Sequence, residues 1–419
     1  MDIFIGIVVG LLVLMFLVTV HEFGHFIMAR RNGVKVLEFG IGFPPRAIAW
    51  IKDPKTHKWR RFKKDEKTDG MIFSLNWIPI GGFCQMDGES AADERAGTFG
   101  HANFWKKTKI LFGGVAMNWL VAFVILTILA WTGMPVFLEN QFTVGSDTTT
   151  TGAKVAVAQV VENSPADEAG FEADDIILSV DGNEVSYSSE INDYNREHAG
   201  REVTYRVSRV VDCGEVDWGE YKECGYNTLV IHDQQIERNL TAKLNESDSE
   251  YLLGIAMSSS QEFRHSTWSA PIVGAGITLQ ITGETFKGLG ELVWNLFSGV
   301  GRMFSPDSSV RESGQAALST VGDSVSGPVG IIGVIFPSFA SSGPANLAFL
   351  AALISISLAC MNVLPIPALD GGRWFLIGFY KLRHKKLTKE TEQKIVSRAM
   401  LVLLALMAIV TIIDITRFF

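Results

Sequence analysis

The sequence predicts an α-helical polytopic membrane protein with about four transmembrane helices and an inserted, extracytoplasmic β-rich domain. The 419 residues are 47% hydrophobic and only 20% charged, a composition that argues against a purely soluble globular chain. Several uncharged stretches are long enough to cross a hydrocarbon core of ~30 Å. The charges between these stretches are segregated by sign. The net charge of −8 argues against general nucleic-acid binding.

Four apolar segments are expected to span the membrane. The first, about residues 3–29, contains no Lys, Arg or Asp, and the basic Arg30 and Arg31 follow it rather than precede it. This order differs from that of a secretory signal peptide, so we interpret the segment as a retained transmembrane helix. The other expected spans are residues 110–135, 345–363 and 399–415.

The charged connections predict the orientation in the membrane. Residues 30–109 hold 16 basic and 9 acidic residues, and residues 373–398 hold 8 and 2, so both connections are positively charged. Residues 139–264 hold 9 basic and 25 acidic residues, a net charge of −16. By the positive-inside rule the two basic connections are cytoplasmic, and alternating spans then place the acidic segment outside.

These observations divide the chain into four parts. The parts are residues 1–150 with the first two spans and a cytoplasmic β-rich loop at 30–105, residues 151–260 as the inserted domain, residues 261–323 as a linker, and residues 324–419 with the last two spans. The linker is expected to contain an amphipathic helix, because apolar residues recur at helical spacing from Phe286 to Val300. This pattern fits a helix at the membrane interface or one packed on the inserted domain.

The inserted domain contains strand-like runs separated by Gly, Asn, Asp and Pro. Its segment NSPADEAGFEADDIILSVDGNEV, residues 163–185, resembles a PDZ domain, although Ala173-Asp174-Asp175 stands where that family usually has Pro-Gly-Asp. The resemblance implies binding of an extended peptide or a carboxyl terminus by strand addition. A β-rich domain that acts only as a spacer is the alternative.

Two of the four cysteines, Cys213 and Cys224, fall in this exterior domain. An oxidising exterior favours a disulfide between them that closes a hairpin-like insertion. Metal binding is the weaker alternative, because no His or further Cys lies nearby at ligand spacing.

The first span contains His21-Glu22-Phe23-Gly24-His25, the pattern H-E-x-x-H. Four residues make about one helical turn, so both imidazoles project from one face and can bind a single Zn²⁺, with Glu22 beside them to accept a proton from water. Ionisable groups are expensive to bury inside a membrane, which favours a functional site over a satisfied polar cluster.

A catalytic zinc ion takes three protein ligands, and the third span supplies a candidate. Asp370 is the first charged residue after the uncharged stretch 324–369, and Pro365 and Pro367 break the helix so that its carboxylate can turn inward. The first and third spans are both expected to run inward, which places His21 and Asp370 at similar depth near the cytoplasmic face. A turn that merely ends the span is the alternative.

HEFGH and NVLPIPALDGG together resemble the site-2 protease family of intramembrane zinc metalloproteases, and the single PDZ-like domain with four spans is similar to the bacterial branch that cleaves anti-sigma factors. The resemblance implies that His21, His25 and Asp370 bind zinc and that Glu22 is the base. It also implies that Asn362 contacts the substrate backbone or the tetrahedral intermediate.

The resemblance extends to the segment GGVAMN, residues 113–118. Asn118 matches the family pattern, whereas Gly114 stands where the family usually has Pro. A part in the site and a close-packed helix contact therefore remain equal alternatives for this segment.

The segment IGGFCQM, residues 80–86, is expected to form a strand. Gly81, Gly82 and Phe83 would lie along a free edge that pairs with an extended substrate, as the resemblance also implies. A plain hairpin on the cytoplasmic side is the alternative.

The expected function is that of a zinc-dependent intramembrane endopeptidase in the inner or plasma membrane of a bacterial cell. Its expected partners are membrane lipid and single-span membrane proteins such as anti-sigma factors or remnant signal peptides, cut near the cytoplasmic face. A non-enzymatic metal transporter and a PDZ membrane scaffold are the alternatives.

Overall fold

A computed structural model describes residues 2–418 except 53–57, 63–69, 91, 92, 94, 139, 152–154, 186, 212–233, 247, 248, 250, 260, 261, 325 and 326. The chain divides into two compact units. The first comprises Met1–Met134, Asn140–Asp147 and Ser266–Phe419, and the second comprises Pro135–Glu139 and Thr148–His265.

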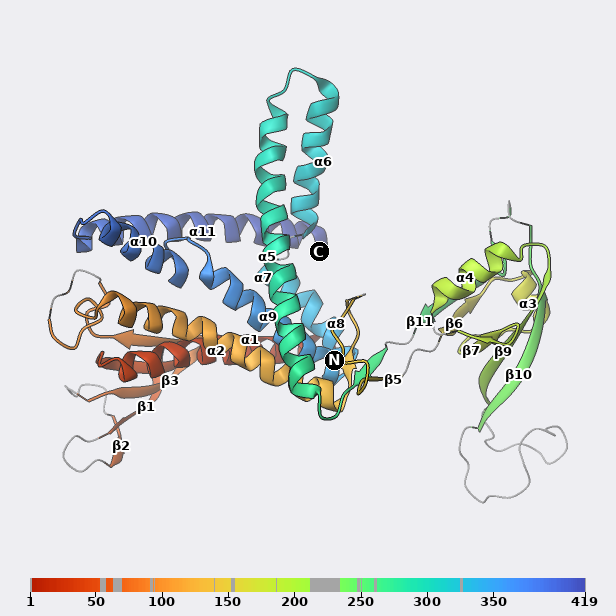
Figure 1. Cartoon of the computed structure of the whole chain (residues 1–419), viewed down its shortest axis with the longest axis horizontal. Coiled ribbons are helices and arrows are strands. Elements are labelled where there is room, and N and C mark those ends of the chain that lie inside the picture. Colours follow the sequence, from red (N-terminus) through yellow and green to blue (C-terminus); the bar gives the residue numbers. More distant parts are fainter. Residues whose placement is uncertain are drawn as a thin grey trace. The chain divides into compact units, whose positions relative to one another are not determined.

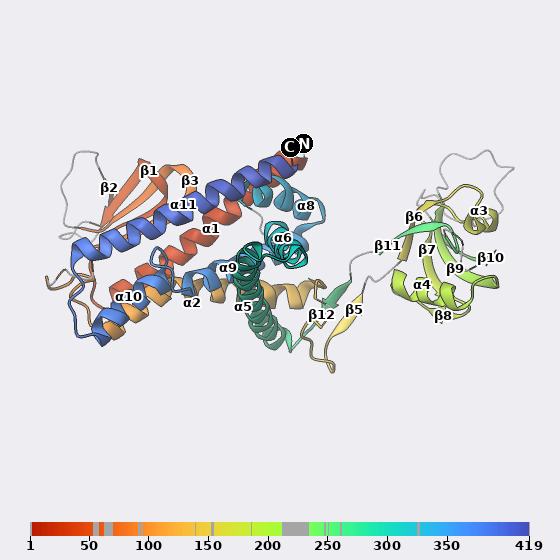
Figure 2. The same cartoon turned by 90° about the horizontal axis from the view of Figure 1, so that it is seen from above.

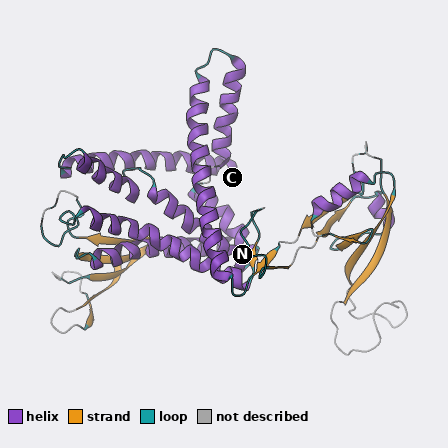
Figure 3. Cartoon of the chain, in the orientation of Figure 1, coloured by secondary structure: helices purple, strands orange, loops and turns teal. Residues whose placement is uncertain are grey.

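Four long apolar helices dominate the first unit (Figures 1 and 3). They are α1 (Asp2–Arg31), α2 (Phe104–Thr132), α9 (Pro344–Val363) and α11 (Lys389–Phe418). Each is long and apolar enough to cross a membrane, so the expected polytopic helical class is confirmed. Helices α2 and α11 start more than a turn before their expected spans. Backbone hydrogen bonding continues into charged turns, such as Lys389 to Arg398, and these turns need not enter the hydrocarbon.

Helix α2 contacts both α1 and α9. The backbones of α2 and α1 approach each other closely at two glycines, where a Cβ added to Gly24 would stand 2.2 Å from the carbonyl oxygen of Gly113. Small residues at a crossing let two helix backbones approach closely inside a membrane. The first part of GGVAMN is therefore a close-packed helix contact.

A small sheet of β1 (Val36–Lys52), β2 (Trp59–Arg61) and β3 (Ile72–Met86) follows α1, in the order β2-β1-β3. Strand β1 is shared, since its residues 39–41 pair with 73–75 on one side and with 82–84 on the other. The last part of β3 is thus an edge among the described strands, and it packs on α1.

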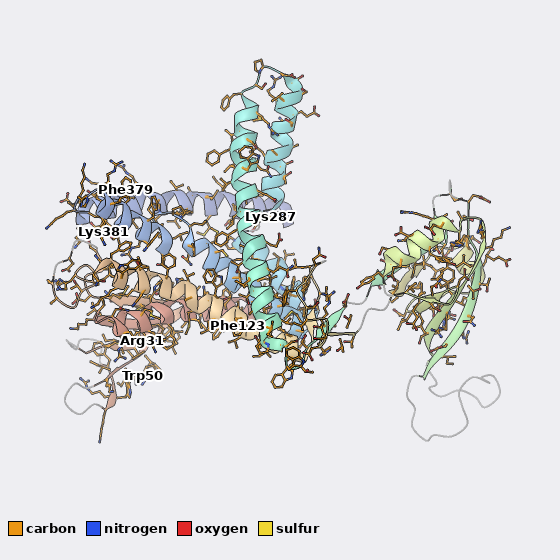
Figure 4. The ribbon with its side chains drawn as sticks, viewed as in Figure 1. Arg31, Trp50, Phe123, Lys287, Phe379 and Lys381 are labelled. Atoms are coloured by element: carbon orange, nitrogen blue, oxygen red, sulfur yellow. The ribbon has the colours of Figure 1, made fainter. Side chains whose placement is uncertain are left out.

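The short helix α10 (Asp370–Leu382) packs on α2. The Trp374 indole Nε1 donates to Thr108 Oγ1 (2.9 Å), and the Lys381 ammonium lies 4.6 Å from the centroid of the Phe104 ring. Lys381 and Arg31 lie toward the same end of the first unit as Trp50 of the sheet (Figure 4). Two basic residues from distant parts of the sequence therefore lie at the end of the unit that carries the sheet.

The expected linker is more helical than the sequence suggested. Helix α5 (Ala270–Met303) has 34 residues; its first half packs on α2 and its second half forms a hairpin with α6 (Ser308–Ser324). Glycines such as Gly274 weaken intrinsic helix propensity, but a Cβ there would stand 2.3 Å from Thr127 Oγ1, so close packing on α2 explains the glycine.

Asp147 anchors the start of α5. Its carboxylate accepts hydrogen bonds from the backbone nitrogens of Thr267 (2.8 Å) and Ser269 (3.0 Å) and from both hydroxyls. These hydrogen bonds, those from the hydroxyls above all, lower the pKa of Asp147 to about 2.

Between α6 and α9 the chain forms α7 (Pro328–Gly330), η1 (Ile331–Ile335) and α8 (Phe336–Ser341), and α8 packs on α1. Asp414 of α11 is only 2% exposed and accepts hydrogen bonds from the backbone nitrogens of Gly327 (3.1 Å) and Gly330 (2.8 Å). Asp414 is thus a buried contact inside α11, where the amides at the start of α7 compensate its charge.

The second unit is β-rich, as expected. An antiparallel sheet runs in the order β10-β9-β7-β6-β11 with β8 paired to β7, and β4, β12 and β5 form a separate three-stranded sheet. Figure 2 shows helices α3 and α4 beside the larger sheet. The bounds are β4 Met134–Pro135, β5 Thr149–Thr151, β6 Val155–Val160, α3 Pro165–Ala169, β7 Ile176–Val180, β8 Asn183–Glu184, α4 Ser188–Glu197, β9 Glu202–Val211, β10 Gln234–Lys243, β11 Ile255–Ser259 and β12 Phe263–His265.

Buried Val157, Ile177 and Tyr205 form part of the core of this unit. The predicted disulfide partners Cys213 and Cys224 lie outside the described residues.

Candidate active site

The HEFGH segment lies within the continuous helix α1, so His21 and His25 are one turn apart on one face. Their Nε2 atoms are 3.1 Å apart, and the rings meet edge to face with centroids separated by 4.7 Å. The two residues are 7% and 6% exposed. Two imidazoles therefore converge inside the helical unit.

Asp370 joins this pair from the other end of the chain. Its Oδ2 lies 3.0 Å from His21 Nε2 and 3.2 Å from His25 Nε2. Asp370 is the first residue of α10, after the turn that ends α9 at Val363. The sequence argument from depth led to the same meeting of the first and third spans.

The two glycines after Asp370 make this turn sterically allowed. A Cβ on Gly371 would lie 2.1 Å from the carbonyl oxygen of Val363, and one on Gly372 would lie 1.9 Å from that of Ile366. Because both obstacles are backbone atoms, a side chain at either glycine would displace the start of α10 and the carboxylate with it.

The three converging atoms fit a small metal ion. Tetrahedral ligands at ~2.0–2.1 Å from Zn²⁺ are separated by about 3.3 Å, close to the 3.0, 3.1 and 3.2 Å found between His21 Nε2, His25 Nε2 and Asp370 Oδ2. Gly114 keeps space beside these ligand atoms, since a Cβ there would lie 2.7 Å from both Nε2 atoms. Nitrogen and carboxylate donors in this number are typical of a catalytic zinc site.

A hydrogen bond fixes the proton of His25. Its Nδ1 lies 2.8 Å from the carbonyl oxygen of Ile110 on α2. A carbonyl oxygen only accepts, so Nδ1 carries the hydrogen and the lone pair of the neutral ring is on Nε2. Metal-binding histidines are commonly oriented in this way.

Glu22 lies between the histidines and the edge of the sheet. Its carboxylate, with the ligand nitrogens of His21 and His25, forms a group in which all ligand atoms lie within 4.8 Å of one another. Its Oε2 accepts a hydrogen bond from the backbone nitrogen of Cys84 on β3 (3.0 Å). A carboxylate with these neighbours can exchange a proton with a water molecule at the ligand cluster.

The Cys84 thiol is no rival nucleophile. Burial raises its pKa to about 12, and the charges of Glu22 and Glu89 act in the same direction. The thiol is therefore protonated at neutral pH, whereas a nucleophilic cysteine needs the thiolate.

The structure places the expected substrate-contacting residues on β3 and in the last turn of α9. A Cβ on Gly81 would lie 3.0 Å from Val18 Cγ1, and one on Gly82 would lie 3.2 Å from Thr19 Oγ1, so both pack on α1 just before His21. Phe83 is next along the same edge segment. The Asn362 amide donates to the Leu358 carbonyl oxygen (2.9 Å) within its own helix.

Sequence reasoning missed two contributions to this site. Ile110 and Cys84 each take part through a backbone atom, so no side-chain pattern indicates them. The side chain of Asn118, left without a definite role by the sequence, lies beside His21.

A membrane-type helical bundle that gathers two imidazoles, an aspartate and an adjacent glutamate defines an intramembrane metallopeptidase. Comparison with known families agrees. The profile of peptidase family M50 matches residues 9–407, and the chain therefore belongs to this family. The membership confirms the resemblance to the site-2 proteases and the prediction of an enzyme over the transporter and scaffold alternatives.

Curated relatives span nearly the whole chain. A Clostridium perfringens protein named as a candidate zinc metalloprotease is 28% identical over 409 residues, which cover 98% of each chain. The zinc metalloprotease RasP of Shouchella clausii is 24% identical, covering 96% of this chain and 97% of the relative. The regulator of sigma-W protease RasP of Bacillus subtilis is 24% identical, covering 96% of each. These names agree with the expected class of zinc metalloendopeptidase and with zinc as its metal.

Proposed function

We propose that this protein is an endopeptidase that cuts single-span membrane proteins near the cytoplasmic face, with His21, His25 and Asp370 as the zinc ligands and Glu22 as the general base. The observation that carries the proposal is the meeting of His21 and Asp370, 349 residues apart in sequence, at 3.0 Å. Residues so distant are brought to metal-ligand spacing only by the tertiary fold.

The chemistry follows from these groups. A zinc ion held by the three ligands supplies Lewis-acid catalysis for the attack of water on an amide. Glu22 takes a proton from the attacking water and returns it to the leaving nitrogen. Glu22 is suited to this transfer because Cys84 N holds one of its carboxylate oxygens and because the carboxylate lies within 4.8 Å of the ligand nitrogens of both histidines.

The substrate must be extended before it is cut, because a helix hides its carbonyl groups in internal hydrogen bonds. The edge formed by Gly82 to Met86 is placed to hold such a segment by strand addition. The N–H of Cys84 points away from β1 toward Glu22. By the alternation of an antiparallel strand the N–H groups of Gly82 and Met86 point the same way, and that of Met86 donates to Glu89 Oε1 (3.0 Å), so a substrate strand would pair first at Gly82.

Replacing Cys84 by Pro tests the contact between the sheet edge and Glu22. The change removes the N–H that donates to Glu22 Oε2 and is not used for pairing with β1, so we expect the sheet to persist and peptide cleavage to fall about tenfold, the effect of roughly one hydrogen bond of ~1.4 kcal/mol that orients the base. The measurement is kcat/KM on a transmembrane peptide.

The matched control is Cys84→Ala, which keeps the N–H and changes only the side chain. Equal activity of the Pro and Ala variants would argue against a role of the Cys84 N–H in orienting Glu22.

The charge pattern supports the proposed orientation. The sheet, Arg31 and Lys381 lie toward one end of the first unit (Figure 4). Arg31 and Lys381 belong to the positively charged connections 30–109 and 373–398, as the positive-inside rule requires of a cytoplasmic end. The acidic segment that contains most of the second unit would then be extracytoplasmic. The Bacillus subtilis relative is named for regulating sigma-W, which supports a membrane-bound regulator such as an anti-sigma factor as substrate; remnant signal peptides are a second substrate of the same chemistry.

The second unit supports PDZ-like peptide binding. Strand β11 is at the edge of the larger sheet, and a hollow of about 600 Å³ lies along it. Residues of α4, among them Asn195 and Arg196, and residues of β11 and the turn before it, among them Gly254 and Ile255, line the hollow. A sheet edge beside a helix and a cation suits an extended peptide with a free carboxyl terminus.

Cleavage by the purified protein tests the proposed function. We expect detergent-solubilised protein to cut a transmembrane peptide, to stop when a zinc chelator is added, and to recover when zinc is restored. A peptide of the same length without the apolar segment is the control for substrate class. Cleavage that continues after complete removal of metal would refute the proposal.

A further inference from the structure

Asn118 lies on α2 at the centre of the first unit and is 1% exposed. Its amide Nδ2 is placed 3.4 Å from Nδ1 of His21, the ring nitrogen that faces away from Asp370. Its backbone carbonyl accepts a hydrogen bond from Ser355 Oγ on α9 (2.9 Å). Asn118 therefore joins three helices of the unit at the back of one imidazole.

If His21 binds a metal through Nε2, that binding determines whether the oxygen or the nitrogen of the Asn118 amide must face its Nδ1. A neutral imidazole that gives its Nε2 lone pair to a metal carries its hydrogen on Nδ1. That N–H is buried and needs an acceptor. The carbonyl oxygen of an amide can accept, whereas its NH₂ group only donates.

The Asn118 amide supplies such an acceptor. Rotation of the amide by 180° exchanges Nδ2 and Oδ1 without changing its shape. As placed, Oδ1 is buried and has no hydrogen-bond partner within the described part of the chain. The rotated orientation directs Oδ1 at His21 Nδ1–H.

We propose that Asn118 is a positioning residue of the metal centre, which accepts a hydrogen bond from His21 Nδ1 through Oδ1 and fixes both the tautomer and the plane of the ring. This inference rests on the proposed zinc site. It makes α2 the common support of both imidazoles, because the Ile110 carbonyl oxygen already holds His25 in the same way (2.8 Å). Acceptors behind metal-binding imidazoles raise their basicity and orient them.

The test is the zinc affinity of purified variants in detergent, measured by competition with a chromophoric chelator. Removal of the acceptor in Asn118→Leu is expected to weaken zinc binding by ~10–100-fold. Asn118→Asp keeps an acceptor and is expected to bind zinc at least as tightly as the unchanged protein. Rescue by the Asp variant separates the hydrogen bond from mere packing.

Asn346→Leu is the matched control. Asn346 is a second buried amide, on α9, whose Oδ1 also has no partner in the described residues and whose Nδ2 donates to the carbonyl oxygen of Ser342, just before that helix. This variant removes the same group elsewhere in the unit and should leave zinc affinity unchanged.

Zinc affinity unchanged in Asn118→Leu would overturn the proposal, and so would an Asp variant as weak as the Leu variant. If Asn118→Leu does not fold, Asn118→Ala removes the acceptor without filling the space and is judged by the same criteria. His21→Ala is measured in parallel. Wild-type zinc affinity in His21→Ala would show instead that the proposed metal site is wrong.

Discussion

Replacing Glu22 by Gln is expected to abolish peptide cleavage while leaving zinc bound. Gln has nearly the same shape and can still accept the hydrogen bond from Cys84 N, but it cannot take a proton from water. The proposed zinc ligands are His21, His25 and Asp370, so the metal should not depend on Glu22. Loss of a general base typically lowers the rate by ~10²–10⁴-fold. The measurement is the rate of cleavage of a transmembrane peptide together with the zinc content of the protein.

The matched control for this variant is Glu89→Gln. Glu89 also accepts a hydrogen bond from a backbone nitrogen of β3, that of Met86 (3.0 Å), but it lies outside the histidine cluster. We expect the Glu89 variant to retain turnover. Undiminished cleavage by the Glu22 variant would rule out its role as the base.

Replacing Asp370 by Ala is expected to remove zinc and activity together. The change leaves two imidazoles, one ligand fewer than catalytic zinc sites use. Zinc affinity should therefore fall by more than the ~10–100-fold expected for loss of a residue that only orients a ligand. Equilibrium dialysis against buffered zinc measures the affinity, and the peptide assay measures the activity.

Asp414→Ala separates this effect from the general cost of losing a buried carboxylate. Asp414, on α11, is also a buried carboxylate, and it accepts backbone hydrogen bonds from Gly327 and Gly330 at the short helix α7. We expect its loss to lower thermal stability but not zinc affinity. An Asp370 variant that holds zinc as tightly as the Asp414 variant would mean that the third ligand is another residue.

The transmembrane helices were predictable from sequence because the conditions for forming one depend on residues that are neighbours in the chain. Backbone hydrogen bonds within a helix are satisfied by neighbours in sequence, and about 20 apolar residues span the hydrocarbon. The four helices were therefore found, while their ends and the identity of Asp414 as a buried residue were not. The extent of α5 was missed, because close packing on α2 at Gly274 compensates for weak propensity.

The sequence alone determined the geometry of HEFGH, because four residues of one helix fix the relation of His21, Glu22 and His25. It also indicated Asp370, since an aspartate at the end of an apolar span is costly without a partner. Only the tertiary structure decided what surrounds these groups. Contacts such as His25 with the Ile110 carbonyl, or Glu22 with Cys84 N, join elements distant in sequence and use backbone atoms. The position of the Ile110 carbonyl depends on how closely α1 and α2 cross at Gly24 and Gly113, and that of Cys84 N on how β3 packs on α1; both are set by packing rather than by any local pattern.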